Sequence, residues 1–196
     1  MTRASVYRQS NHREEEQLSF SFATRPPVVD SGGIRLTRAL LDHPSTPRIL
    51  KMVRVALAYF PELGETSVRI GLARGAQGYA SLEEPAIWLN PRRLSYQTIA
   101  HELVHLLQAS GRVPKGERSC DVYSLARDTI LVDAAPAYLR IPGGLVTPDG
   151  WLRPGGPRLL FETACEAIER RKAGTRQYIR WFEKRVFESW PHADQV

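Results

Sequence analysis

The sequence is poor in cysteine and lacks any long apolar run. Only two cysteines, Cys120 and Cys165, occur in 196 residues, which is too few for a disulfide framework. No stretch of about 18 apolar residues is present, so we expect no membrane-spanning helix and no membrane partner. The N-terminal residues contain no apolar segment typical of an export signal. These absences predict a cytoplasmic protein whose cysteines are reduced and buried as small hydrophobic residues.

The positive charge of the chain is concentrated near its C-terminus. The formal net charge is +6, and residues 170–185 carry seven basic residues and one acidic residue, so this segment alone contributes seven minus one, or +6. The basic residues are Arg170, Arg171, Lys172, Arg176, Arg180, Lys184 and Arg185, and the acidic residue is Glu183. Such a segment is either a solvated helix face or a binding site for nucleic acid or another acidic partner.

Proline, glycine and apolar residues divide the chain into four segments. Residues 1–30 are mostly polar and are predicted to be a disordered N-terminal tail. Residues 31–135 are predicted to form the core. Residues 136–157 contain five prolines and five glycines, which predicts a long irregular loop of a kind that is often functional. Residues 158–196 carry two apolar stripes at helical spacing and predict a helical hairpin packed on the core.

The core segment combines helical and strand patterns, which predicts the α+β fold class. Ser95 is a suitable N-cap and Gly111 a suitable stop for the helix between them, which is apolar on most sides. Gly71, Gly75 and Gly78 predict a turn or a loosely held crossover between two strands. The expected elements are a helix over 47–59, strands over 66–72 and 85–90, a helix over 95–110 and a further helix over 117–133.

Three ionisable residues lie within the apolar helix over 95–110. His101 and His105 are four residues apart, so their imidazoles share one helix face and can bind one Zn²⁺ ion. Glu102 lies about 100° round the helix from His101, which keeps it off the metal but leaves it able to face a metal-bound water. Since buried ionisable groups cost several kcal/mol unless they are paired or ligated, the pattern predicts a zinc site with Glu102 as general base.

A third protein ligand is needed, and no histidine lies between His105 and His192 to supply it. Glu117 and Asp121 are the nearest carboxylates and share one face of the following helix. The loop before them is long enough to return Glu117 to the level of the histidines. We therefore expect Glu117 to be the metal ligand and Asp121 to accept the second N–H of a liganding imidazole. Asp121 and Asp128 are the alternative ligands.

The motif HELVH followed by GERSCD resembles the gluzincin metallopeptidases, whose second motif places a glutamate ligand four residues before an aspartate. ERSCDVYSLA is similar to the ExxAD-type helix of the membrane-associated peptidases of that clan and, less closely, to the second helix of ImmA/IrrE-type proteins. AIWLNP resembles the edge strand that lines the zincin cleft and holds an extended substrate. The resemblance covers about residues 45–135, and the compact minigluzincins are the closest analogy.

The resemblance implies a zincin-like core, in which a small, partly antiparallel sheet packs on the HExxH helix and on a second ligand-bearing helix. It also implies zinc-dependent hydrolysis of a peptide or protein substrate, with Glu102 taking a proton from water and passing it to the leaving amine. The developing oxyanion needs a further donor, for which the candidates are Tyr123, Tyr138, Arg140 and His192.

Two other functions compete with a peptidase of extended peptides. A peptidase that acts on DNA-bound proteins would use residues 170–185 to hold DNA, by analogy with SprT-like and ImmA-like proteins. A zinc-stabilised binding or regulatory module would cleave nothing. The position of Glu102 beside both histidines argues against that module, because a structural zinc site requires no general base.

Overall fold

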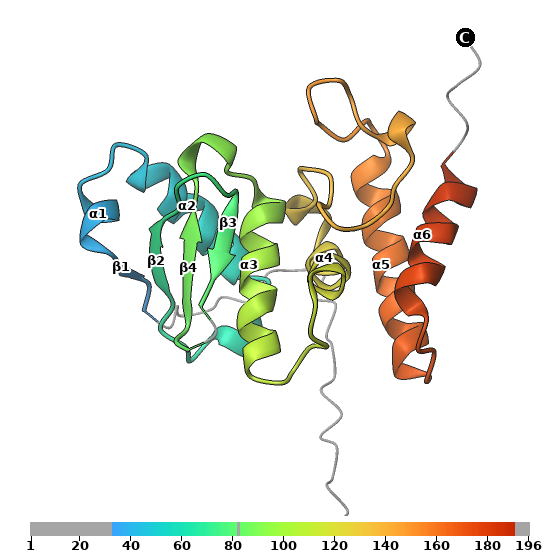
Figure 1. The fold of residues 1–196 in the computed structure, drawn as a ribbon, viewed down its shortest axis with the longest axis horizontal. Helices are drawn as coiled ribbons and strands as arrows, with labels where there is room; N and C mark the ends of the chain where they lie inside the picture. The colour runs from blue at the N-terminus through green and yellow to red at the C-terminus, as the bar shows by residue number, and fades with distance from the viewer. Residues whose placement is uncertain (1–32, 82, 191–196) are drawn as a thin grey trace, which may run out of the picture.

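A computed structural model describes residues 33–81 and 83–190. The tail predicted over residues 1–30 and the oxyanion candidate His192 lie outside this range. Within it the chain forms six α-helices and a four-stranded sheet, which confirms the α+β class (Figure 1). The elements are β1 (Arg35–Leu36), α1 (Arg38–Leu41), α2 (Thr46–Leu57), β2 (Arg69–Leu72), β3 (Gly78–Ala80), β4 (Ala86–Leu89), α3 (Tyr96–Ala109), α4 (Glu117–Leu125), α5 (Gly156–Lys172) and α6 (Tyr178–Ser189).

The sheet is mixed, with strand order β1-β2-β4-β3. Strands β1, β2 and β4 are parallel, and β3 runs antiparallel to β4. The predicted strands over 66–72 and 85–90 are present as β2 and β4. The expectation that AIWLNP forms the edge strand is wrong, because β4 lies between β2 and β3. The glycine-rich segment turns back at Gly75, where φ is +87°, and supplies β3 as the edge instead of a plain crossover.

Helix α3 begins and ends where the sequence predicts. The Ser95 hydroxyl accepts the backbone N–H of Thr98 at 3.0 Å, and the chain turns away at Gly111, where φ is +76°. The Asp133 carboxylate accepts the two backbone N–H groups of Tyr96 and Gln97, each at 2.9 Å. Since these bonds satisfy three of the four free donors of the first turn, the helix start is fixed.

Helix α3 occupies the centre of the molecule. It packs against β3 and β4 on one side and against α4 on another, and Figure 1 shows it between the sheet and α4. Its apolar side chains, including Ile99, Leu103 and Leu107, are fully buried. Burial of an apolar side chain contributes about 1.5–3 kcal/mol, so this helix is held by packing on several sides.

Helix α4 is shorter than predicted, because it ends at Leu125 and not near Asp133. The buried Arg127 side chain turns back to bind the Glu62 carboxylate at 2.9 Å. Asp128 then caps a short 3₁₀ turn, η3 (Thr129–Leu131), by accepting the N–H of Ile130 at 2.9 Å. These contacts of Arg127 and Asp128 hold the backbone in a non-helical conformation directly after α4.

The C-terminal part consists of a long connection and two paired helices. The loop predicted over residues 136–157 ends at 155, directly before α5 begins, and its one helical element is a short 3₁₀ turn, η4 (Gly143–Leu145). Two isolated β-bridges hold this region, Ala134 to Trp151 and Val146 to Leu152. Helices α5 and α6 pack on each other, and α5 also packs on α4. Figure 1 shows the pair at the end of the molecule opposite the sheet.

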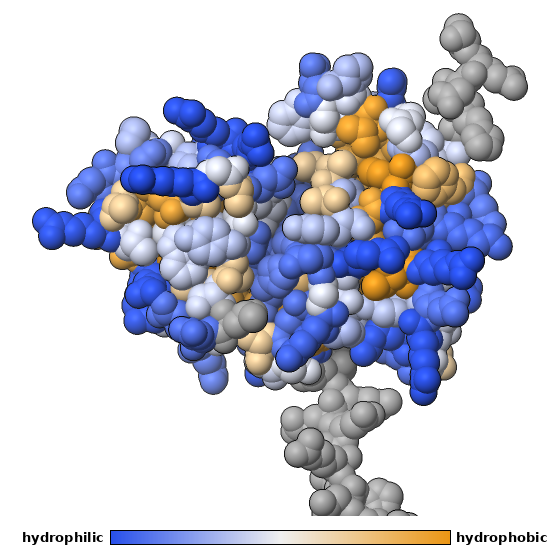
Figure 2. Space-filling model, viewed as in Figure 1, coloured by the Kyte–Doolittle hydropathy of each residue, from blue (hydrophilic) through white to orange (hydrophobic). Residues whose placement is uncertain are grey.

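The surface of this helix pair is not uniformly basic. Figure 2 shows the most strongly hydrophobic area of the visible face over the half occupied by α5 and α6. The guanidinium of Arg170 lies 4.2 Å from the ring centre of Trp181 and also pairs with Glu166. In the part of the chain that the structure describes, no helix combines the length and apolar character needed to cross a membrane.

Candidate metal centre

Two helices bring the predicted ligands together. His101 and His105 project from the same face of α3, with ring centres 4.9 Å apart. Gly116, at φ +107°, turns the chain into α4, so that Glu117 is the first residue of that helix. The Glu117 Oε2 atom lies 3.0 Å from His101 Nε2 and 3.2 Å from His105 Nε2. Three potential ligand atoms therefore converge on one point between α3 and α4.

The hydrogen bonds of Asp121 fix the tautomer of His101. Asp121 is 1% exposed, and its Oδ1 atom lies 2.8 Å from His101 Nδ1. Its second oxygen accepts the backbone N–H of Tyr138 at 2.6 Å. Since an ionised carboxylate can only accept hydrogen bonds, His101 Nδ1 carries a proton towards Asp121. The other ring nitrogen, Nε2, lies 3.0 Å from Glu117 Oε2 and is the atom that would offer its lone pair to a metal ion in the neutral ring.

The amide of Gln108 fixes the tautomer of His105. Its Nε2 atom donates to the backbone carbonyl groups of Pro114 at 2.6 Å and Gly116 at 3.0 Å. Its Oε1 atom is therefore the acceptor that lies 3.1 Å from His105 Nδ1. His105 Nδ1 must carry the proton, so Nε2, which lies 3.2 Å from Glu117 Oε2, is the nitrogen left to bind a metal ion. This role of Gln108 is not predicted by the sequence analysis.

The converging atoms fit a metal ion. The Nε2 atoms of two imidazoles face one carboxylate oxygen, and neutral rings would leave both nitrogens able to bind an ion. Ligand atoms at 2.0–2.1 Å from a tetrahedral ion lie about 3.3 Å apart, close to the distances of 3.0 and 3.2 Å found for this set. Without a metal ion, the cluster favours an added proton on His101. Burial lowers the pKa of His101, but its bonds to Asp121 and Glu117 and the charge of Glu102 outweigh burial and raise it.

Cys120 offers a second donor set. One ligand atom each from His101, His105 and Cys120 lies within 4.8 Å of the others, so this group could also bind a metal. Its sulfur lies 3.3 Å from His105 Nδ1, the nitrogen already bonded to Gln108, and not on the side of the ring that faces Glu117. The geometry therefore favours Glu117.

Sequence reasoning did not identify Cys120 as a donor. The available signal was its position three residues after Glu117, which places it on nearly the same helix face. Asp128, the other alternative ligand, caps the η3 turn through its bond to Ile130 N; like Glu117, it is not part of the group of His101, His105 and Cys120.

Glu102 lies beside the convergence point but outside it. It is 5% exposed, and its Oε2 atom forms no hydrogen bond within residues 33–81 and 83–190. Burial raises the pKa of Glu102 to about 7, with His101 lowering it and Glu117 raising it. Its carboxyl packs against β3 at Gly78, where a Cβ atom would lie 2.8 Å from Oε1. An unbonded buried carboxyl next to a polar cleft is suited to proton transfer.

A cleft passes over the centre in two halves. The first half has a volume of about 760 Å³ and lies at the N-terminal end of α3; the second has about 610 Å³ and lies at the C-terminal end. Gly78, His101, Glu102 and Tyr138 line both halves, so the two meet at the centre.

The edge strand β3 presents free backbone groups to this cleft. Gln77 accepts the N–H of Asn90 and Ser81 donates to Ala86, each at 2.9 Å, so alternate residues from 77 to 81 are bonded to β4. In an antiparallel pair the intervening residues, Gly78 and Ala80, turn their N–H and C=O groups to the other side. Both residues line the second half of the cleft.

Of the predicted oxyanion donors, Tyr138 lies at the centre. Its ring stacks on His101 with centres 5.6 Å apart, and its side chain is 51% exposed. Tyr123 is buried at 3% exposure among core residues, and the backbone of Arg140 donates to Glu183 at 2.9 Å. Neither Tyr123 nor Arg140 lines the cleft.

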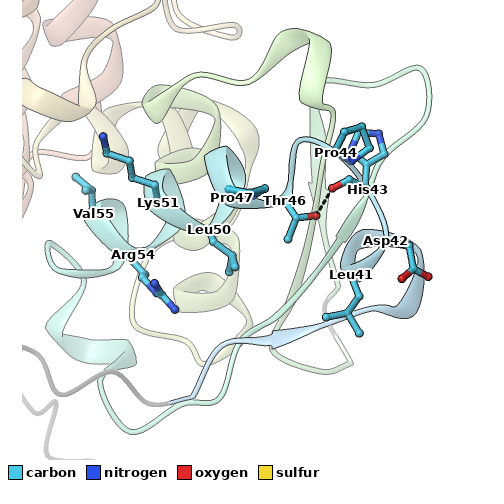
Figure 3. Close-up of a pocket in the computed structure, with 10 residues that line it drawn as sticks. All are labelled: Leu41, Asp42, His43, Pro44, Thr46, Pro47, Leu50, Lys51, Arg54 and Val55. Carbon is cyan, nitrogen blue, oxygen red and sulfur yellow. Dashed lines mark hydrogen bonds between the residues drawn. The ribbon is translucent and has the colours of Figure 1, made fainter.

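A separate hollow of about 880 Å³ lies between α1 and α2, and Figure 3 shows the side chains that line it. It contains one imidazole, His43, whose Nδ1 atom accepts the backbone N–H of Ser45 at 3.1 Å. Asp42 is the one carboxylate that lines it, so it lacks the convergent donors of the centre on α3 and α4.

Comparison of the chain with models of known protein families gives no match. Comparisons with curated proteins and with solved structures also give no match.

Proposed function

We propose that the chain is a zinc-dependent peptidase of the gluzincin type, with His101, His105 and Glu117 as metal ligands and Glu102 as general base. One observation carries the proposal: Glu117 Oε2 lies 3.0 Å from His101 Nε2 and 3.2 Å from His105 Nε2, the two ring nitrogens that are not bonded to Asp121 or Gln108. Two nitrogen ligands with one carboxylate are typical of catalytic zinc sites, which keep a further position open, whereas structural sites are closed by four protein ligands.

Each residue of the centre has a separate task in this proposal. A bound zinc ion supplies Lewis acidity, which lowers the pKa of water and polarises a carbonyl group. Asp121 and Gln108 hold the imidazoles in the required tautomer and orientation. Glu102 accepts a proton at its unbonded Oε2 atom and delivers it to the leaving amine. Tyr138 donates a hydrogen bond to the carbonyl oxygen of the substrate.

The cleft suits an extended peptide. Gly78 and Ala80 leave one backbone donor and one acceptor each for a further strand, which is the usual basis of peptide binding at a sheet edge. The mixed sheet, the edge strand beside α3 and the second ligand-bearing helix α4 support a zincin-like core of the minigluzincin kind. The substrate is therefore an unfolded or flexible segment of a peptide or protein.

Metal analysis combined with a peptide digest tests the proposal. The purified protein should contain about one zinc per chain, and a His101→Ala, His105→Ala double variant should lose it. Glu102→Gln should keep the zinc and lose hydrolysis of a peptide library, whereas the exposed control Glu166→Gln should keep both. Full zinc occupancy in the double variant, or undiminished cleavage by Glu102→Gln, would contradict the assignment.

No comparable observation supports a DNA-directed peptidase. Arg170, Lys172 and Lys184 all pair with carboxylates of their own helices. If residues 170–185 bind duplex DNA, replacing Arg176, Arg180 and Lys184 by glutamine should flatten the salt dependence of binding by roughly two to three units. Absence of salt-dependent DNA binding by the wild type would contradict that interpretation of the segment.

A further inference from the structure

The two halves of the cleft differ in charge. Three arginines line the first half: Arg48 from α2, and Arg92 and Arg93 from the 3₁₀ turn η2 (Pro91–Arg93). Apart from Glu102 and Asp121 of the centre, Asp149 is the one acidic residue among the lining side chains. The second half is lined by one basic residue, Lys115, and by Glu102 and Glu117 of the centre. Positive charge is therefore concentrated on one side of the reacting position.

These arginines are available for a ligand. All three are exposed, and within the described residues none of their guanidinium groups forms an ion pair. The turn that carries Arg92 and Arg93 is held by Asn90, whose side chain accepts the N–H of Arg92 at 3.0 Å and donates to Ala76 at 3.0 Å. The backbone that carries these two consecutive arginines is therefore hydrogen-bonded, through Asn90, to the segment that precedes β3. Guanidinium groups bind carboxylates through paired hydrogen bonds, which favours an acidic occupant.

The start of α3 does not compete for that occupant. Its first backbone N–H groups, on Tyr96 and Gln97, are already bonded to the Asp133 carboxylate. An acidic group entering the first half of the cleft is therefore recognised by the arginine side chains and not by the helix terminus.

The direction of β3 places this half relative to the bond that is cut. Gly78 lines both halves, Ala76 and Gln77 before it line the first half, and Tyr79 and Ala80 after it line the second half. Because antiparallel pairing is more stable per residue than parallel pairing, we expect an added peptide to run opposite to β3, so the residues after the reacting bond enter the first half.

We infer that Arg48, Arg92 and Arg93 select substrates with aspartate or glutamate in the first few positions after the cleaved bond. The inference rests on the proposed peptidase function and names its substrate class. Exposed charge pairs change binding by a factor of about 1.5–5 each, so the expected preference is a few-fold and weakens as salt is raised.

A digest of a proteome-derived peptide library by the zinc-loaded protein tests the preference. Aspartate and glutamate should be enriched about two- to fivefold in the three positions after the cut, relative to the library. A variant with Arg48, Arg92 and Arg93 replaced by glutamine should lose the enrichment. The matched control replaces three exposed arginines outside the cleft, Arg35, Arg38 and Arg54, the last of which lines the hollow in Figure 3. Equal enrichment in the cleft variant and the control would overturn the inference.

A binding measurement separates this inference from the proposed function. Zinc-loaded Glu102→Gln protein is immobilised, and the same library is passed over it at low and at high salt. Acidic peptides should be retained at low salt and should be lost when the three cleft arginines are also replaced by glutamine. If the wild type cleaves nothing, the proposed function fails, yet retention of acidic peptides through these arginines still supports the inference. Retention without acidic enrichment overturns it whether or not cleavage occurs.

Discussion

Replacing Gly78 by alanine should displace the carboxyl group of Glu102. A Cβ atom at this position would lie 2.8 Å from Glu102 Oε1, 3.0 Å from Glu102 Cγ and 3.1 Å from the backbone oxygen of Trp88. The Trp88 carbonyl is held in the ladder between β3 and β4, so it cannot withdraw. The Glu102 side chain is the neighbour that is able to move, and it must move away from β3.

The size of the effect follows from these distances. Ordinary contacts of a Cβ atom begin near 3.4 Å, so the Glu102 oxygen must retreat by about 0.6 Å. Overpacking of this kind costs about 1–3 kcal/mol of folding stability. A misplacement of about 1 Å in a catalytic site costs on the order of 100-fold in rate, so we expect kcat/KM to fall by about 10- to 100-fold. Zinc content should not change, because the nearest atoms belong to Glu102 and Trp88 and not to the proposed ligands.

Gly143→Ala is the matched control, since an added Cβ atom there meets nothing within 4 Å and the backbone φ is not positive. Urea unfolding, zinc analysis and peptide hydrolysis should be compared for the two variants and the wild type. Gly143→Ala should stay within about 0.5 kcal/mol of the wild type. Our account of Glu102 is refuted if Gly78→Ala matches this control in both stability and hydrolysis.

Three further predictions concern the metal. Glu117→Ala should weaken zinc binding more than the 10–100-fold expected for Asp121→Asn, and Cys120→Ala should weaken it least. Competition with a chromogenic chelator measures this order of affinities. A larger loss of affinity in Cys120→Ala than in Glu117→Ala would make Cys120 the ligand. Gln108→Leu should lower zinc affinity by about 10–100-fold, because the hydrogen bond that orients His105 is lost; an unchanged affinity would show that His105 is oriented by other contacts. Removing zinc with a chelator should lower the free energy of unfolding of the wild type by about 4 kcal/mol, relative to protein at a free zinc concentration 1,000 times Kd. Thermal unfolding measures the difference, and His101→Ala should unfold alike with and without zinc.

The fold was predictable where local pattern and burial agree. Helix α3 carries an N-cap, a glycine stop and an apolar surface, and its bounds follow from these signals. Strand β3 has only Tyr79 between two small residues, so its pairing is decided by contact with β4 and not by its own composition. The end of α4 depends on the buried pair of Arg127 and Glu62, which are 65 residues apart in sequence. Such long-range contacts leave no local pattern.

In the candidate metal centre too, the residues related by local sequence pattern were predictable and those related by long-range contacts were not. The histidines and Glu102 are related by helical periodicity, and the reach of the loop before Glu117 limits which carboxylate can approach them. Gln108 could not be identified in this way, because its role depends on the carbonyl groups of Pro114 and Gly116. The positions of backbone oxygens in an irregular loop are set by the folded structure alone.

The division of the proposed ligand atoms between α3 and α4 would make a bound metal equivalent to a reversible cross-link. One helix belongs to the half of the molecule that contains the sheet, and the other is packed on the C-terminal helices. An ion held by the proposed ligands His101, His105 and Glu117 would join these halves, and its binding energy would become folding energy for their interface. Zinc supply would then set how often the two halves part, and with it how long each copy of the chain survives the proteases of its surroundings.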